Sequence, residues 1–189
     1  MTRPRIIGIK GEARSGKNTV AEVCVEECGY MTYGFADPIK RALAGWLTNA
    51  AKTVSVHDIE TLKAEIPIRK ALQMIGTEIG RDIISKTLWI DCLKARIDPT
   101  LKIGFNIVIP DVRFLNEAAA IRDWGGVVWG VRRPDHEDEL PNECALHKSE
   151  MEVSEIQCDH TFVNDGSVDA LRDQAREALG VETAQVKEA

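Results

Sequence analysis

The feature that most constrains this chain is a glycine-containing loop between an apolar run and a helix-forming run. Residues 11–19, GEARSGKNT, follow the run RIIGIK and open the stretch NTVAEVCVEECG. Gly11, Gly16 and Lys17 have the spacing of a phosphate-binding loop, in which backbone N–H groups surround phosphate oxygens and the lysine reaches the outer phosphates. Because a strand and a helix flank the loop as this mechanism requires, we predict a P-loop here.

One residue departs from the usual motif, since Asn18 stands where a serine or threonine normally follows the lysine. The usual hydroxyl binds Mg²⁺, whereas the carbonyl oxygen of an asparagine amide could bind the ion directly or through a water molecule. Thr19 supplies a hydroxyl one position later. We expect a magnesium site at Asn18 or Thr19, and the sequence leaves open which of them contacts the metal.

The composition is that of an ordinary globular protein. With 189 residues, 44% hydrophobic and 29% charged, the chain suits one domain or one domain plus a lid. The net charge of -6 argues against broad adhesion to a nucleic acid polymer or an anionic membrane. No stretch approaches the ~18 apolar residues of a membrane span, and the first apolar run is too short for a secretory signal. We therefore expect a cytoplasmic protein.

The cysteines predict no disulfide framework. Five of them, including Cys24 and Cys28, form neither CxxC pairs nor an array with histidines. Cys24 and Cys28 are four residues apart on a predicted helix, which could indicate a metal or redox pair. Buried, reduced thiols are the interpretation that we favour.

Short β-rich runs alternate with helical stretches along the chain. This alternation predicts an α/β fold of three layers, with a mostly parallel five-stranded sheet between helices. The run FNIVIPD, bounded by Gly104 and Pro110, is typical of a strand buried on both faces and is expected to be central. The predicted strands are residues 5–10, 30–35, 105–111, 127–131 and 160–165, and the main helices are 17–28, 38–51, 67–84, 88–97, 114–124 and 168–180.

Two of the predicted helices carry residues that point toward a site. Asp37 and Pro38 are typical of an N-cap and a first-turn proline, and the apolar face that follows is expected to pack on the sheet. In the helix over 67–84, an apolar stripe leaves polar residues at intervals of four on another face, which is either one wall of a nucleotide pocket or a solvated surface. The first face comprises Ile39, Leu43, Trp46 and Leu47, the stripe comprises Leu72, Ile75, Ile79 and Ile83, and the polar face comprises Gln73, Thr77 and Arg81.

Ligands of parallel sheets bind beyond the carboxyl ends of the strands, which places Gly11, Asp37, Asp111 and Arg132 along one rim. Asp111 is placed like a Walker B carboxylate, able to hold a metal-bound water beside the P-loop. Arg113 could bind an acceptor phosphate or pair with a carboxylate. The alternatives are a helix cap with a surface ion pair for Asp111 and Arg113, and a plain N-cap for Asp37.

The segment over residues 134–150 is acidic, rich in turn-forming residues and long enough to act as a lid. Arg132 and Arg133 precede it, and at least one of them is expected to reach the transferred phosphoryl group when the lid closes. His147, Ser149 and Glu150 lie too close together in sequence for a hydrolase triad, so we assign them to lid closure or polar packing. We expect a single domain over 1–181 and a frayed polar tail over 182–189.

Taken in order, the motifs resemble the deoxynucleoside monophosphate kinases of tailed phages, within the P-loop nucleoside monophosphate kinase superfamily. The resemblance rests on GEARSGKNTVAE, GFADPIKRAL, LQMIGTEIGRD, IVIPDVRFLNEA, GGVVWGVRRP, HKSE and DHTFVNDGSVDAL, and it covers most of the chain. It implies a P-loop kinase fold and transfer of the γ-phosphate of ATP to a deoxynucleoside 5′-monophosphate, with Mg²⁺. For a phage-encoded protein, the location would be the host cytoplasm.

The resemblance also implies roles for individual residues. Catalysis falls to Lys17, Asp37 and Arg132, with Asp37 as an orienting hydrogen-bond acceptor rather than a strong base. Since the family often has Asp where this chain has Asn18, the metal contact is the point of departure. ATP would be held by Gly11, Arg14, Ser15, Gly16, Lys17, Asn18 and Thr19, the acceptor by Ile39, Lys40, Arg69, Gln73, Thr77, Arg81, Trp89, Asp111, Arg113 and Glu117, and the metal by Asn18, Thr19 and Asp111.

Other functions stay open at this point. Phosphomevalonate kinases share PDVR, SE and VNDG, and dephospho-coenzyme A kinases share the general layout. A nucleotide-binding switch or assembly ATPase would use the P-loop without an acceptor, and Asn18 also allows a non-catalytic binding module. The sequence leaves open which nucleobases are accepted, whether ribose is excluded, and whether the chain forms a homodimer.

Overall fold

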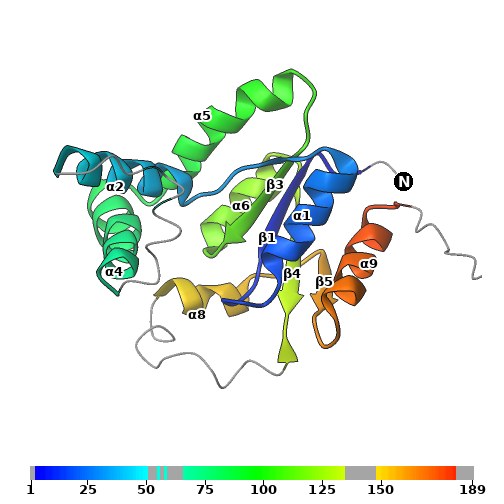
Figure 1. The fold of residues 1–189 in the computed structure, drawn as a ribbon. Helices are drawn as coiled ribbons and strands as arrows, with labels where there is room; N and C mark the ends of the chain where they lie inside the picture. The colour runs from blue at the N-terminus through cyan, green and yellow to red at the C-terminus, as the bar shows by residue number, and fades with distance from the viewer. Residues whose placement is uncertain (1–2, 51–54, 56–57, 59–65, 135–147, 182–189) are drawn as a thin grey trace, which may run out of the picture. The chain divides into compact units, whose positions relative to one another are not determined.

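The computed structural model describes residues 3–50, 55, 58, 66–134 and 148–181. The chain divides into two compact units, one formed by residues 1–33 with 99–189 and the other by residues 34–98. The first contains the sheet and the second is helical (Figure 1). The expectation of one domain over 1–181 stays a prediction.

The first unit is built on a five-stranded sheet in the order β2-β3-β1-β4-β5, and every neighbouring pair is parallel. The prediction of a mostly parallel sheet is therefore confirmed. The strand that contains Val108 was predicted to be buried on both faces and central; it is an interior strand with Ile107, Val108 and Ile109 buried, and it lies next to the middle strand β1. The strands are β1 (Ile6–Lys10), β2 (Met31–Thr32), β3 (Ile107–Val112), β4 (Val127–Arg132) and β5 (His160–Val163).

Helices cover both faces of this sheet, because alternate residues of β1 point to opposite sides. Ile7 and Ile9 are buried in a core shared with α1 (Lys17–Cys28) and α9 (Val168–Ala178). On the other side, a Cβ built on Gly8 would lie 2.4 Å from Ile121 of α6 (Leu115–Asp123), so this strand position needs a residue without a side chain. The three-layer arrangement is confirmed.

The first and last helices begin and end close to the predicted residues. Helix α1 runs from Lys17 to Cys28 and is followed by Gly29 in a left-handed conformation. Helix α9 begins after Ser167, whose hydroxyl accepts a hydrogen bond from the Ala170 N–H at 3.1 Å. Both helices follow local sequence signals, since glycine ends helices and serine caps them.

Strand β3 contains a bulge that the sequence did not reveal. Gly8 pairs with Ile109 and Lys10 pairs with Val112, so Pro110 and Asp111 together face one residue of β1. The predicted strand over 105–111 included Pro110, as β3 does, but the bulge was not predicted. Because proline has no N–H to donate, a bulge is one of the few places where an interior strand accepts it.

The second unit consists of helices around one apolar cluster. Its elements are α2 (Asp37–Ala50), α4 (Ile66–Met74), the π-helix η1 (Ile75–Ile84) and the first part of α5 (Leu88–Lys102). Ile39 and Leu43 of α2 pack in a cluster with Ile75 and Trp89, so this face packs on helices where we expected the sheet. Trp46, predicted to share the face, is 58% exposed.

The apolar stripe predicted for residues 67–84 is also wrong in its second half. Ile79 and Ile83 are exposed, whereas Thr77 and Arg81 are buried. The reason is that residues 75–84 form a π-helix, whose hydrogen bonds span five residues rather than four. The wider turn rotates the faces relative to an α-helix, so the stripe expected to be buried meets solvent.

Helix α8 (Lys148–Glu155) lies within a segment that we did not predict as helical. Most of the expected lid, residues 135–147 with His147, lies outside the described residues. Ser149 and Glu150 belong to α8, and their side chains are likewise outside the description. In the described part of the chain, no helix has the length and apolar character needed to cross a bilayer.

The thiols are reduced where the structure describes them. Cys24, Cys28, Cys92 and Cys158 are free, and Cys144 lies outside the described residues. Burial raises the pKa of the Cys24 thiol to about 12, with a further contribution from the nearby Cys28. A thiol with this pKa stays protonated at neutral pH, so it is a poor metal ligand and a poor nucleophile.

Candidate functional site

The loop between β1 and α1 has the backbone of a phosphate-binding loop. Gly11 and Gly16 have φ values of 153° and 106°, and Arg14 lies in the left-handed region with φ 62°. A Cβ on Gly11 would lie 2.4 Å from the Val131 carbonyl oxygen, so no other residue fits there without movement. Strained backbone of this kind gathers at ligand sites, and these torsions turn N–H groups into the concave side of a loop.

Hydrogen bonds from Asn164 and Lys17 hold this loop in place. Asn164, directly after β5, donates from its side-chain amide to the Ser15 carbonyl at 2.9 Å and from its backbone N–H to the Arg132 carbonyl at 2.8 Å. Lys17 Nζ donates to the Glu12 carbonyl across the loop. Asn164 was not predicted as a site residue, although its place at the carboxyl end of the last strand was a usable signal.

Ser15 marks where a ligand is expected. Its side chain is 2% exposed, and its Oγ is a buried polar atom with no hydrogen-bond partner in the structure. A buried, unsatisfied hydroxyl costs about 1–3 kcal/mol. Because this atom lies in the loop expected to bind phosphates, a bound phosphate oxygen would satisfy it.

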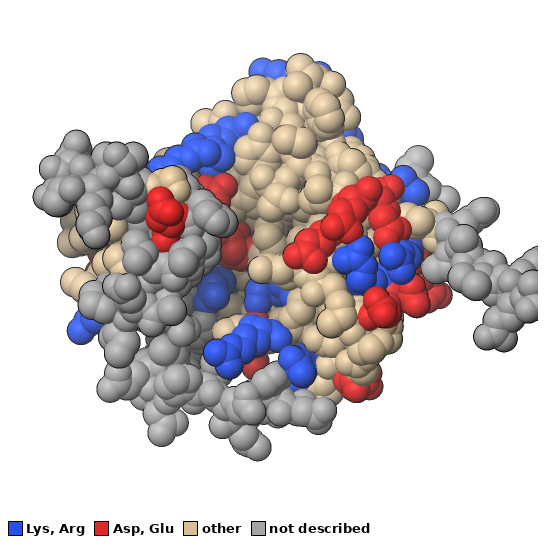
Figure 2. Space-filling view, in the orientation of Figure 1, with Lys and Arg blue, Asp and Glu red and all other residues tan. Residues whose placement is uncertain are grey.

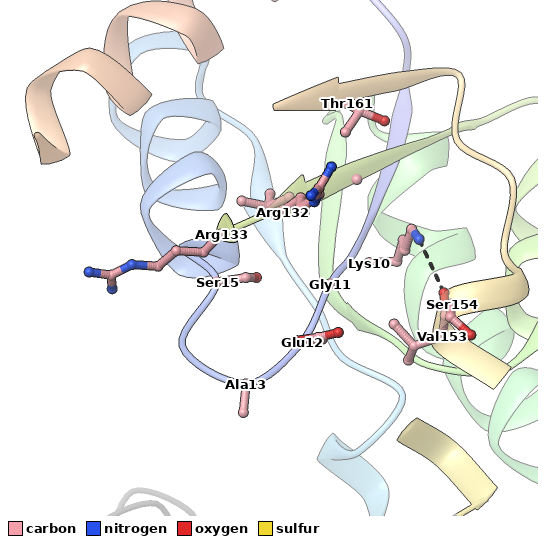
Figure 3. A pocket seen from close by; sticks show the side chains of 12 residues that line it. Lys10, Gly11, Glu12, Ala13, Ser15, Arg132, Arg133, Val153, Ser154 and Thr161 are labelled. Carbon is pink, nitrogen blue, oxygen red and sulfur yellow. Dashed lines mark hydrogen bonds between the residues drawn. The ribbon is translucent and has the colours of Figure 1, made fainter. Parts of the chain in front are cut away.

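A cavity of about 240 Å³ lies beside the loop (Figure 3). Drug-sized ligands occupy roughly 300–1,000 Å³, so this space suits phosphate groups rather than a whole nucleotide. In Figure 3 the Arg133 side chain extends away from the other labelled side chains, whereas the Arg132 side chain lies on the side of Lys10 and Thr161. The lining residues are Lys10, Gly11, Glu12, Ala13, Ser15, Gly130, Val131, Arg132, Arg133, Val153, Ser154 and Thr161.

The strand register places two predicted site residues on either side of the loop. Lys10 pairs with Val112 of β3 on one side and with Gly130 of β4 on the other. Asp111, at the bulge, therefore lies level with the start of the loop, and Arg132 ends the neighbouring strand. The expected rim is confirmed for Gly11, Asp111 and Arg132, and Figure 2 shows basic side chains near the junction of β1 and α1.

Glu117 has a clear local role in the same region. Its carboxylate Oε2 accepts hydrogen bonds from the backbone N–H groups of Arg113 at 2.8 Å and Phe114 at 3.1 Å. The carboxylate is 2% exposed and occupies the N-terminal end of α6, where negative charge is favourable. Glu117 thus fixes the turn that carries Arg113, and no observation places its carboxylate on a substrate.

The oxygen donors of the loop and of β3 fit a magnesium ion. Asn18 is exposed, and Thr19 and Asp111 are half-buried. Amide, hydroxyl and carboxylate oxygens are hard ligands, and Mg²⁺ in kinases is bound by one or two protein oxygens plus phosphates and water. The described residues contain no group of three or more His, Cys, Asp or Glu side chains able to hold a metal.

The predicted acceptor residues of the second unit fall into two groups. Asp37 is the first residue of α2 and not the cap before it. Its Oδ2 accepts from the Gly34 N–H and from Arg96 Nη1, both at 3.1 Å, so its carboxylate orders this turn. Ile39 is buried, Lys40 and Gln73 are half-buried, and Arg69 lies in α4 with its side chain outside the description.

The second group lies around the π-helix. Thr77 and Arg81 are each 7% exposed, and Arg81 Nη1 donates to the Lys86 carbonyl at 3.5 Å. Trp89 donates from its indole N–H to the Gly76 carbonyl at 2.7 Å, and a Cβ on Gly80 would lie 2.3 Å from its ring. Trp89 therefore packs tightly within this unit, and the acceptor role of all three residues stays a prediction.

Comparison with known proteins decides the family. The model of the deoxynucleotide monophosphate kinase family matches residues 5–66 and 47–175. The chain belongs to this family. A mimivirus protein (Acanthamoeba polyphaga mimivirus), provisionally named a deoxynucleotide monophosphate kinase, is 26% identical and aligns over 89% of this chain and 93% of its own length.

A second relative agrees with this placement, and one solved structure shares the fold. The deoxynucleoside-5′-monophosphate kinase of Escherichia phage T5 is 26% identical and aligns over 62% of this chain and 72% of its own length. The dephospho-CoA kinase from Campylobacter jejuni is similar in structure, with a TM-score of 0.54, 14% identity and coverage of 93% of this chain and 96% of that chain. At this identity the likeness confirms the fold alone.

Proposed function

We propose that this member of the deoxynucleotide monophosphate kinase family transfers the γ-phosphate of ATP to a deoxynucleoside 5′-monophosphate. The observation that carries the proposal is the loop around Ser15, whose buried Oγ lacks a partner beside a phosphate-sized cavity. Family membership supplies the acceptor class. A phosphate-binding loop alone would also be expected in a nucleotide-binding switch, so the acceptor class rests on the family.

In the proposed reaction an oxygen of the acceptor phosphate forms a bond to the γ-phosphorus, while the bond from that phosphorus to the β,γ-bridging oxygen breaks. The products are a deoxynucleoside diphosphate and ADP, which keeps the electron pair of the broken bond. The acceptor oxygen is already anionic, so no strong base is required. The protein therefore has two tasks: to align the acceptor oxygen with the γ-phosphorus, and to neutralise the negative charge of the phosphates.

The chain offers residues for each part of this work. The backbone N–H groups of the loop bind the donor phosphates, and Lys17 exchanges the Glu12 carbonyl for the outer phosphates. Arg132 lines the cavity, where its positive charge would neutralise part of the negative charge of the transferred phosphoryl group. Asn18, Thr19 and Asp111 would hold Mg²⁺, which when bound neutralises phosphate charge.

The test is a coupled assay of ADP release with purified protein, ATP and Mg²⁺. We expect turnover that depends on a deoxynucleoside monophosphate, measured with the four common ones and their ribonucleotide counterparts. Phosphomevalonate and dephospho-coenzyme A serve as acceptors from the two rival kinase classes. ATP hydrolysis at the same rate with and without every acceptor would contradict the proposal and favour a switch or ATPase.

A further inference from the structure

Helix α8 contacts two segments of the proposed site through two consecutive residues. The Val153 carbonyl oxygen accepts a hydrogen bond from Lys10 Nζ at 3.1 Å. The carboxylate Oε2 of Glu152 accepts one from the backbone N–H of Leu115 at 3.3 Å. Lys10 directly precedes the P-loop, and Leu115 lies two residues after Arg113. Helix α8 thus joins the loop after β1 to the turn after β3.

Both bonds suit the helix ends at which they form. Val153 lies in the last turn of α8, where carbonyl groups lack partners within the helix and a lysine is favourable. Leu115 is the first residue of α6, where N–H groups lack such partners and a carboxylate is favourable. Val153 is 3% exposed and Lys10 is half-buried, so the first bond is partly shielded from water.

The contact with α8 adds to the hydrogen bonds that Glu117 accepts within the turn after β3. The bulge at Pro110 and Asp111 interrupts the pairing of β3 with β1 directly before the turn. A bulge unpairs one residue and bends its strand, so the strand ladder alone fixes the turn less firmly than regular pairing would. In a reaction that depends on alignment, a displacement of about 1 Å can lower the rate about 100-fold.

We propose that Lys10 and Glu152 are positioning residues, which use α8 to fix the P-loop and the Asp111–Arg113 turn relative to each other. In this role neither residue touches the reacting atoms, because Lys10 binds the Val153 carbonyl and Glu152 binds the Leu115 N–H. The proposal rests on the proposed function for its kinetic consequence. The structural linkage itself requires only the two hydrogen bonds. Lys10 also lines the cavity, so the competing explanation is a direct contact between Lys10 and phosphate.

The first test is hydrogen exchange of the full-length protein without nucleotide. In Lys10→Met, we expect the Leu115 amide to exchange about tenfold faster, although this amide is bound by Glu152 of α8 and not by Lys10. In Glu152→Ala, we expect faster exchange in residues 11–19. Lys102→Met and Glu155→Ala, at exposed positions, are the matched controls. Exchange that changes only beside each substitution would overturn the proposal.

The second test separates kcat from KM. Loss of alignment lowers kcat, so Lys10→Met and Glu152→Ala should each lower kcat about tenfold or more while KM for ATP changes less than about threefold. Loss of a direct phosphate contact would instead raise KM for ATP and leave exchange at Leu115 unchanged. That combination would overturn the proposal.

A conservative variant and a double variant complete the design. Lys10→Arg keeps a positive donor that can reach the Val153 carbonyl, so it should retain most of the activity, and an arginine variant as impaired as Lys10→Met would contradict the proposal. Because both residues act through α8, the double variant should lose less than the product of the single losses. Fully multiplicative losses would contradict a shared route.

The two proposals fail in different ways. If the wild-type protein phosphorylates no deoxynucleoside monophosphate, the proposed function fails. Faster exchange at Leu115 in Lys10→Met would still support the linkage through α8. If turnover is normal and exchange at Leu115 is unaffected in this variant, the linkage fails and the proposed function stands.

Discussion

The P-loop and the π-helix η1 are both predicted to contact a nucleotide, but the sequence predicts the structure of the first far better than that of the second. In the P-loop, Gly11 and Gly16 have the unusual torsions that the motif predicts. In η1, the apolar periodicity predicts an α-helix with Ile79 and Ile83 inside, and the structure has both outside. Glycines at positions that need unusual torsions therefore predict local structure more reliably than a periodicity that assumes one helix type.

The P-loop and η1 also differ in how each holds its basic side chain. Lys17 lies at the first turn of α1 and is half-buried, donating to a loop carbonyl that a phosphate could replace. Arg81 is 7% exposed and held within the second unit. The position of Lys17 suits a cation that binds a ligand reversibly. The position of Arg81 suits either a fixed contact with a ligand or a structural role. Four predictions test this difference.

The largest effect is expected from Lys17→Ala. Loss of a cation that binds the outer phosphates should lower kcat at least about 10³-fold, while the fold is kept because the side chain contributes little to the core. Turnover is measured by ADP release and the fold by circular dichroism. Lys102→Ala, at an exposed position outside the site, is the control. Retained turnover would remove the P-loop from the mechanism.

Next comes Gly11→Ala, which adds a Cβ at 2.4 Å from the Val131 carbonyl at a φ of 153°. Torsional strain and overpacking together should lower the free energy of unfolding by about 3 kcal/mol. Gly29→Ala is the matched variant, since Gly29 also has positive φ but no neighbour within 4 Å, and should cost only about 1 kcal/mol. Equal losses in urea unfolding would show that the close approach is unimportant.

A smaller effect is predicted for Arg81→Gln. If Arg81 binds the acceptor phosphate, loss of a charged hydrogen bond should raise KM for the monophosphate about tenfold or more and leave KM for ATP unchanged. Lys70→Gln on the exposed side of α4 should change neither value. An Arg81→Gln protein that is less stable but has normal KM for the monophosphate would assign Arg81 to structure alone.

The smallest effect is expected at the ion pairs between α1 and α9, where Figure 2 shows acidic and basic side chains side by side. The hydrogen bond from Arg176 lowers the pKa of Glu27 below its ordinary value of 4.5. The pair therefore stabilises the fold above that pH and loses its effect as the pH falls through the depressed pKa. Glu27→Gln should lower the midpoint of thermal unfolding slightly at pH 7.

The pH dependence is the check on this last prediction. Wild type and Glu27→Gln should converge in thermal midpoint at pH values where Glu27 is protonated in the folded protein. A difference that persists unchanged in acid would contradict the assignment to charge. Exposed pairs of this kind are screened by salt, so the difference at pH 7 should also shrink at high ionic strength.

Much of the sheet-based unit could be predicted from sequence, because its glycines, the Ser167 cap and the alternating apolar runs report local geometry. The rim formed by Gly11, Asp111 and Arg132 followed from the rule for parallel strands. The bulge at Pro110 was missed because strand pairing depends on the partner strand. The π-helix was missed because the spacing of Leu72, Ile75 and Ile79 fits an α-helix equally well.

Parts of the site depend on contacts between distant residues, and the sequence alone could not supply them. The unsatisfied Ser15 Oγ is visible only once Gly11 and its neighbours close around it. The bond from Asn164 to the Ser15 carbonyl joins residues 149 positions apart. Helix α8 was hidden in a polar segment whose apolar residues are too sparse for a periodic signal, so its link to Lys10 was not foreseen.

The central claim is that the P-loop moves a phosphoryl group to an acceptor phosphate and does more than bind nucleotide. The most direct measurement follows ATP labelled at its γ-phosphate, mixed with each deoxynucleoside monophosphate and with wild-type or Lys17→Ala protein. We predict that the label appears in a deoxynucleoside diphosphate with the wild type and not with Lys17→Ala. Label found only in ATP or in free phosphate with the wild type would contradict the account.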